Sequence, residues 1–337
     1  MVLSLLFSLE ETEMKRGLKM MMASLAGLVL MGAAHAQYPA RQVNMVVAFP
    51  AGGPSDVVAR VMGKAIAEHT SQPVIVENVV GVGGALGVLK VANAPADGYT
   101  ILAGSPLELI YTPLGIAAAK NKPDDMRMAA LMGRTPMLIA VRKDLPVNTL
   151  AELIEYAKKA PKPLAFGSTG VGSLYHLMAE DAAKIGKYEA LHAPYNGLAP
   201  YLKDLMGGVL DWGVLPVAGP VPGAIESGQI KAIAVVAPAP IARLPKVPSV
   251  RDTSGFGNYD YSIWIGLQVS KNTPDAIAAA LNSAVLAALA KPDVRKSVEA
   301  TGVILAPPMT LSRLDSFYKD EIAAGAAVAK SVGLKPQ

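Results

Sequence analysis

The sequence predicts an α/β protein whose two lobes are each built on a largely parallel sheet. The chain has 337 residues, more than one domain usually holds. Its apolar fraction of 52% and charged fraction of 17% are typical of a folded chain with a sizeable core. From Val43 onward, short β-rich runs alternate with helical patterns, as in βαβ units. No Pro/Ser-rich linker divides the chain, so we expect it to cross between the lobes on strands.

The N-terminus has the pattern of a secretory signal peptide. A basic stretch at residues 15–19 precedes the apolar run Met20–Met31 and a small-residue site at 34–36. We expect cleavage after Ala36. Residues 1–13 contain glutamates that suit an export signal poorly, so we expect translation to start at Met14. A membrane anchor is the alternative, but the run is shorter than the ~20 residues that a span needs.

Strands are predicted where β-branched and apolar residues run between turn residues. We expect the chain to cross between lobes near Met137–Val141 and Tyr261–Val269. Lobe 1 then comprises residues 37–138 and 262–337, and lobe 2 comprises residues 139–261. The expected strands are Val43–Phe49, Pro73–Glu77, Tyr99–Ala103, Met137–Val141, Leu164–Phe166, Tyr188–His192, Val209–Val214, Ile230–Val236 and Ile263–Val269.

Helices are predicted from apolar periodicity and from their end signals. Thr149 and Glu152 form a capping box for a helix that ends at Lys159. Thr273 is the expected N-cap of a helix with a proline at its first position. C-terminal helices are expected to return to lobe 1. The helix that Thr273 is expected to cap is Asp275–Leu289, and the other expected helices are Asp56–His69, Leu174–Ile185 and Leu198–Met206.

Composition and motif content argue against catalysis, metal binding and nucleic-acid binding. The absence of cysteine excludes disulfides, thiol catalysis, thiolate metal sites and a lipid anchor on an N-terminal cysteine. The net charge of +4 is spread over mixed-sign stretches, which does not indicate a nucleic-acid partner. His69, His176 and His192 lack zinc-site spacing, and neither a phosphate loop nor a nucleophile elbow occurs. We therefore expect a binding protein that is not an enzyme and needs no cofactor or metal.

Loops of small residues follow several predicted strands. In Ala51–Asp56, glycines let the backbone approach an anion, Ser55 or Asp56 can cap the following helix, and the helix N-terminus attracts negative charge. Open α/β sheets bind ligands at such strand ends. The loops therefore predict a cleft for a small carboxylate, with tight turns or flexible linkers as the alternative. Similar loops are Gly104-Ser105-Pro106, Gly167–Ser173, Pro194–Gly197 and Leu215-Pro216-Val217.

Some residues have two interpretations. Gly81–Gly87 is similar to a dinucleotide-binding fingerprint, but Leu86 replaces its third glycine, which favours a packing turn. His176 can donate to a ligand or hold the preceding loop. Tyr195, Trp212 and Trp264 can line a pocket or belong to the core.

A specific series of motifs runs along the mature chain: Phe49–Arg60, Gln72–Asn78, Gly81–Gly84, Pro95–Thr100, Gly167–Ser173 and Pro194–Gly197. The series resembles the substrate-binding proteins of tripartite tricarboxylate transporters, the Bug family. The resemblance implies a periplasmic-binding-protein type II fold, with a ligand cleft between two α/β lobes and two crossover strands. It also implies a periplasmic monomer that closes by a hinge and delivers its ligand to one large and one small integral membrane permease subunit.

The resemblance further implies a carboxylate site made of loop residues from both lobes. The sequence departs from the family at Asn196, where lysine is common, at Pro54 and along Gly104–Leu109. Family ligands include di- and tricarboxylates, acidic amino acids, and aromatic or nicotinate-type acids. The expected site residues are Phe49, Ala51, Gly52, Gly53, Ser55, Asp56, Gly104, Ser105, Ser168, Thr169, Gly172, Ser173, His176, Tyr195, Asn196, Gly197 and Pro216.

Two other functions stay open at this point. The chain could be a ligand sensor that docks on a receptor kinase. It could instead be a periplasmic hydrolase that uses Ser173 with His176.

Overall fold

The computed structural model describes residues 38–336. The expected signal peptide and the start at Met14 lie outside these residues. The chain divides into two units, Met1–Ala40 and Arg41–Gln337. Everything below concerns the second unit.

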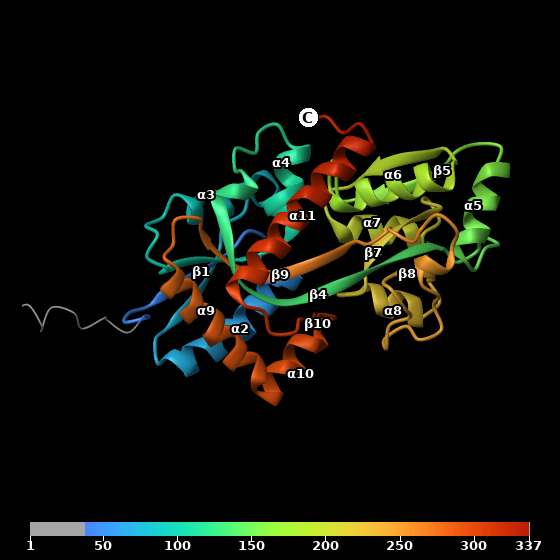
Figure 1. Ribbon diagram of the computed structural model, residues 1–337. Helices are drawn as coiled ribbons and strands as arrows, with labels where there is room; N and C mark the ends of the chain where they lie inside the picture. The colour runs from blue at the N-terminus through green and yellow to red at the C-terminus, as the bar shows by residue number, and fades with distance from the viewer. Residues whose placement is uncertain (1–37, 337) are drawn as a thin grey trace, which may run out of the picture. The chain divides into compact units, whose positions relative to one another are not determined.

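The second unit is an α/β structure with a mixed sheet, and the longest strand of this sheet pairs with different strands along its length (Figure 1). The pairs β1–β2, β1–β3, β5–β6 and β5–β7 are parallel, whereas β4 and β9 pair antiparallel with their neighbours. The strand order is β2(Val74–Asn78), β1(Val43–Val47), β3(Thr100–Gly104), β9(Ser262–Ser270), β4(Met126–Arg142), β7(Trp212–Pro216), β5(Leu164–Ser168) and β6(Ala190–Pro194), while β8(Ile230–Val236) and β10(Ile304–Leu305) pair with β4.

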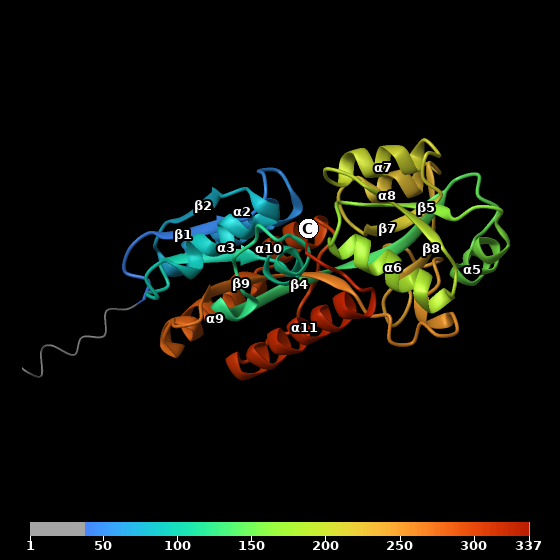
Figure 2. The ribbon, with the colours of Figure 1, turned by 90° about the horizontal axis from the view of Figure 1, so that it is seen from above.

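The long strand β4 joins two half-sheets. Residues 126–136 of β4 pair with β9, and residues 137–142 pair with β7 and β8. We call β1, β2, β3, β9, β10 and the start of β4 the first half-sheet, and β5 to β8 with the end of β4 the second half-sheet. In both ribbon views β4 and β9 run together from one group of helices to the other (Figure 2). The predicted class, two α/β lobes joined by two crossover strands, is confirmed.

Helices that accompany the first half-sheet come from both ends of the described chain. In α2 a left-handed Ser71 ends the helix, and α11 packs along β4. Thr273 was expected to cap α9, but this prediction is wrong because Pro274 holds the N-cap position and Thr273 is buried. The helices are α2(Pro54–Thr70), α3(Ala85–Ala92), α4(Thr112–Gly115), α9(Asp275–Ala290), α10(Pro292–Ala300) and α11(Leu311–Ser331).

Helices of the second half-sheet start at the predicted caps. The Thr149 hydroxyl accepts from Glu152 N–H at 3.2 Å, and the Glu152 carboxylate accepts from Asn148 N–H at 2.6 Å. The Ser173 hydroxyl caps α6 by accepting from His176 N–H at 3.3 Å. The helices are α5(Leu150–Lys159), α6(Leu174–Gly186), α7(Leu198–Met206) and α8(Val221–Glu226).

Core packing resolves two of the open interpretations. Trp212 and Trp264 are fully buried, so both belong to the core. Residues 81–84 form a tight turn that leads into α3, and a Cβ on Gly87 in the first turn of α3 would lie 2.9 Å from Ala48 Cα, which supports the packing role. Among residues 38–336 no single helix has the length and hydropathy of a membrane span, and α9 with α10 reaches both only as a pair bent by 89°.

Candidate functional site

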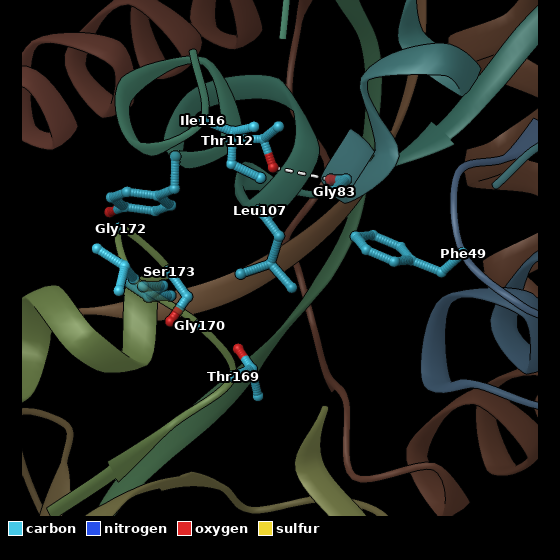
Figure 3. A pocket seen from close by; sticks show the side chains of 12 residues that line it. Phe49, Gly83, Leu107, Thr112, Ile116, Thr169, Gly170, Gly172 and Ser173 are labelled. Atoms are coloured by element: carbon cyan, nitrogen blue, oxygen red, sulfur yellow. Dashed lines mark hydrogen bonds between the residues drawn. The ribbon is translucent and has the colours of Figure 1, made fainter. Parts of the chain in front are cut away.

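A cavity of about 160 Å³ lies between loops of the two half-sheets (Figure 3). Phe49 comes from the loop after β1, and residues 107–116 form a π-helical turn and α4 after β3. The opposite wall is the loop between β5 and α6. In Figure 3 the Thr169 hydroxyl points toward Leu107 across the cavity. The lining residues are Phe49, Gly83, Leu107, Tyr111, Thr112, Ile116, Thr169, Gly170, Val171, Gly172, Ser173 and Leu174.

Hydroxyl groups supply the side-chain hydrogen-bond donors of this cavity wall. The Thr112 hydroxyl donates to Gly83 C=O at 2.8 Å and is therefore engaged. The Ser173 oxygen accepts from His176 N–H, which leaves its own hydrogen available to a ligand. Within the described part of the chain, the Thr169 hydroxyl has no protein partner. The second half-sheet therefore offers two O–H donors to a carboxylate.

The two walls touch at Gly115 and Gly172. A Cβ added to Gly115 would lie 2.7 Å from Gly172 Cα, and one added to Gly172 would lie 2.5 Å from Gly115 Cα. Both distances are shorter than real side chains tolerate, so only glycine allows this backbone approach. Gly172 also has a φ of +77°, which favours glycine independently.

Two stacked imidazoles brace the loop that carries Thr169 and Ser173. Gly172 N–H donates to His176 Nδ1 at 3.1 Å, which requires that nitrogen to be unprotonated. Ser168 Oγ lies 2.6 Å from His192 Nε2 and also bonds to the backbone of Gly170. The ring centroids of His176 and His192 are 4.0 Å apart. Of the two interpretations of His176, the structure shows the loop-holding one.

The imidazole of His192 is held in its neutral form. Burial first, and then the charge that His176 would carry, lower the pKa of His192 to about 4. Glu180 Oε1, 3.7 Å from His176 Nε2, acts in the opposite direction on the His192 pKa. Near neutral pH the pair therefore acts as a hydrogen-bonding support without positive charge on His192.

In the first half-sheet, Asp56 occupies the expected anion-binding loop. Its carboxylate accepts from Gly52 N–H, from Arg60 and from Asn78, each at 2.9 Å. The Arg60 hydrogen bond contributes most to lowering the pKa of Asp56 to about 2. Contrary to expectation, neither Ser55 nor Asp56 caps α2, because Gly53 holds the N-cap position without a side-chain bond. Ala51, Gly53, Ser55 and Asp56 do not line the cavity.

A second internal carboxylate occupies the loop after β3. Glu108 accepts from Ser105 N–H at 2.6 Å and from the Ser105 hydroxyl at 2.5 Å. Both residues are 1% exposed, and burial raises the pKa of Glu108 to about 7. Gly104 N–H donates to Gln268 Oε1 at 3.0 Å. The donors of Gly104 and Ser105 are thus engaged within the protein, away from the cavity surface.

The remaining expected residues lie elsewhere on the second half-sheet. The Tyr195 hydroxyl donates to Asp204 at 2.8 Å, Asn196 is exposed, and Gly197 is the N-cap of α7. Pro216 lines a second, more open hollow together with Gly52 and Arg243.

The structure thus brings only part of the expected set to the cavity. Phe49, Thr169, Gly172 and Ser173 line it, and Ser168 and His176 support its wall. Sequence reasoning missed Leu107, Tyr111, Thr112, Ile116 and the arginine of the second hollow. For Leu107, Tyr111, Thr112 and Ile116, the sequence signal is their place directly after Gly104-Ser105. Within residues 38–336, no group of three or more acidic or imidazole side chains could hold a metal ion.

Comparison with known proteins gives one consistent family. Residues 58–334 match the family model described as "Tripartite tricarboxylate transporter family receptor". A protein of Agrobacterium vitis from the TAR-I ttuE-ttuC' intergenic region is 34% identical over 92% of this chain and 90% of its own length. Protein BugT of Bordetella pertussis is 31% identical over 88% of this chain and 91% of its own.

Solved structures of similar proteins share the fold along nearly their whole length. The periplasmic binding protein BugD is 31% identical, with a TM-score of 0.74 over 89% of this chain and 100% of its own. Rpa4515 of R. palustris, solved with adipate, is 30% identical, with a TM-score of 0.77 over 89% and 100%. MatC of Rhodopseudomonas palustris, solved with bound malate, is 29% identical, with a TM-score of 0.74 over 87% and 100%.

Proposed function

The chain belongs to the tripartite tricarboxylate transporter receptor family of solute-binding proteins, and we propose that it captures a small carboxylate in the cavity beside Thr169 and Ser173. The family includes periplasmic binding proteins, and two similar structures hold malate and adipate. In this proposal the chain is exported, loses residues 1–36 and works as a periplasmic monomer without catalysis.

The observation that supports this proposal is a cavity lined by loops of both half-sheets, with the hydroxyls of Thr169 and Ser173 as donors on the side of the second half-sheet. A hydroxyl that bonds a charged acceptor contributes about 1.5–3 kcal/mol when both groups are desolvated. A ligand that contacts both walls stabilises the arrangement in which they meet, which is how hinge closure is driven. The glycine contact at 115 and 172 supports such closure because it lets the walls meet without side chains between them.

We also propose the boundaries of the two lobes and the membrane protein that receives the ligand. Lobe 1 comprises residues 37–138 and 262–337, and lobe 2 residues 139–261. The change of partner within β4 between Pro136 and Met137 supports the first boundary. The closed form would deliver the carboxylate to a permease of one large and one small integral membrane subunit.

The binding proposal is tested by a thermal-shift screen over aliphatic and aromatic carboxylates, followed by calorimetry with Thr169→Val. A specific ligand raises the melting temperature by mass action. Loss of the hydroxyl at nearly constant shape should weaken binding about 10- to 150-fold. Thr70→Val is the control, because its hydroxyl bonds Ile66 C=O within α2. If Thr169→Val binds the ligand with the affinity of the parent protein, the carboxylate site must lie elsewhere.

The rival functions predict other outcomes. A hydrolase needs Ser173 beside an imidazole nitrogen, but Ser173 contacts the backbone of His176, whose Nδ1 accepts from Gly172. Ser168 does contact His192, yet it is 0% exposed and cannot reach a substrate without movement of the loop. Ester turnover that is lost in His192→Gln would support that rival. A receptor kinase recovered with the ligand-bound protein would support the sensor.

A further inference from the structure

We propose that the ligand carries a single carboxylate on an apolar body about the size of one ring, an inference that rests on the proposed function. Such a compound is an aromatic or alicyclic monocarboxylate. The chemistry of the two cavity walls and the side chains behind them carry the argument.

The wall opposite Thr169 and Ser173 is mostly apolar. Phe49, Leu107, Ile116 and the ring of Tyr111 form it, and the Tyr111 hydroxyl adds a polar group. Val171 and Leu174 extend the apolar surface around Thr169 and Ser173. No Lys, Arg, Asp or Glu lines this cavity in the part of the chain that the structure describes. A malate-like ligand would place its polar end against this mostly apolar surface and lose more hydration than it gains in hydrogen bonds. An apolar body gains from the same burial.

The size of the cavity fits one ring. Its volume is about 160 Å³, and an apolar protein cavity of about 150 Å³ is known to hold benzene. A six-membered ring therefore fills the space when its carboxylate reaches Thr169 and Ser173. A longer chain with a second carboxylate would have to extend toward loops 51–56 or 104–105.

Donors in those loops are already engaged by internal carboxyl groups. The Gly52 amide already serves the buried Asp56, and both donors of Ser105 serve the buried Glu108. Glu108 lies between two lining residues, Leu107 and Tyr111, on the π-helical turn. Each internal carboxyl group therefore uses donors that a second ligand carboxylate would need. The two neighbouring loops thus favour a ligand with one carboxylate.

Calorimetry on the unmodified protein tests this directly with benzoate, cyclohexanecarboxylate, adipate and malate. We expect each monocarboxylate to bind at least ten-fold tighter than either dicarboxylate. Adipate or malate binding as tightly as benzoate would overturn the inference while the proposed function stands. Binding of none of the four would reject both.

A variant tests the apolar wall separately. Leu107→Asn keeps the side-chain size and adds a polar amide, so benzoate affinity should fall at least ten-fold while adipate affinity does not fall. Leu191→Asn is the matched control, since Leu191 is 61% exposed on β6. An equal loss for both ligands would show damage to the fold and would contradict the assigned wall. The melting temperature of each unliganded variant is measured alongside.

Discussion

Replacing Gly115 by alanine tests whether the cavity closes on the contact between Gly115 and Gly172. The new Cβ would lie 2.7 Å from Gly172 Cα and 3.1 Å from its carbonyl oxygen, whereas ordinary contacts are 3.4–4 Å. The walls must separate by about 1 Å. Steric strain of this kind costs roughly 1–3 kcal/mol. If it falls on the ligand-bound form, affinity drops about 5- to 150-fold.

Gly115 is a better target than Gly172 for this experiment. It lies in α4, where alanine is compatible with the backbone and raises helix propensity, whereas Gly172 has a φ of +77°. The melting temperature of the unliganded variant should therefore stay near that of the parent. Gly223→Ala in α8 is the control, because a Cβ there would meet no heavy atom within 4 Å.

Calorimetry of a carboxylate identified by the screen gives the readout. Unchanged affinity in Gly115→Ala would refute the role of this contact in closure. A drop in the unliganded melting temperature that matches the loss of binding energy would also refute it, because the contact would then exist without ligand.

Two further substitutions test the side chains behind the walls. Because Glu108 has a folded pKa of about 7 against 4.5, it costs stability as pH rises from about 4.5 to 7. Glu108→Gln removes this dependence, so denaturant unfolding should show the variant gaining up to about 3 kcal/mol on the parent between pH 5 and pH 8; parallel pH profiles would contradict it. His176→Asn keeps an acceptor for Gly172 N–H, whereas His176→Phe removes it. Calorimetry should therefore show ligand affinity near that of the parent in His176→Asn and clearly weaker affinity in His176→Phe, and equal affinities in the two variants would reject the support role.

Local patterns predicted most elements of the fold. The bounds of β8 and α7 match the expected ranges, and Thr149 caps α5 as expected. The expected strand at 137–141 was too short, because β4 begins at Met126 and passes through Pro136. A proline lacks the N–H for a ladder bond, so sequence rules end a strand there. In the fold, β4 pairs with β9 up to Pro136 and with strands of the second half-sheet from Met137 onward. This change of partner depends on tertiary pairing.

The loops of small residues follow the ends of strands, as expected, but their chemistry was predictable only in part. Gly52 and Ser105 are small residues in loops after strands, and such residues are typical of anion-binding loops. Whether their donors face a ligand depends on the side-chain conformations of Asp56 and Glu108. Sequence spacing does not determine those conformations. The residues lining the apolar wall were missed for a related reason, since apolar residues after a strand are typical of core.

The division of roles between the walls has a consequence for affinity. The second half-sheet supplies the O–H donors of Thr169 and Ser173, while the first supplies apolar surface and two internally bound carboxylates. Apolar contact is not directional, so it contributes affinity without fixing how a ligand lies. Orientation must then come from the loop at 168–173, which the two imidazoles hold in place. Substitutions in the apolar wall should therefore change which ligands bind, whereas substitutions behind the loop should weaken the binding of every carboxylate alike.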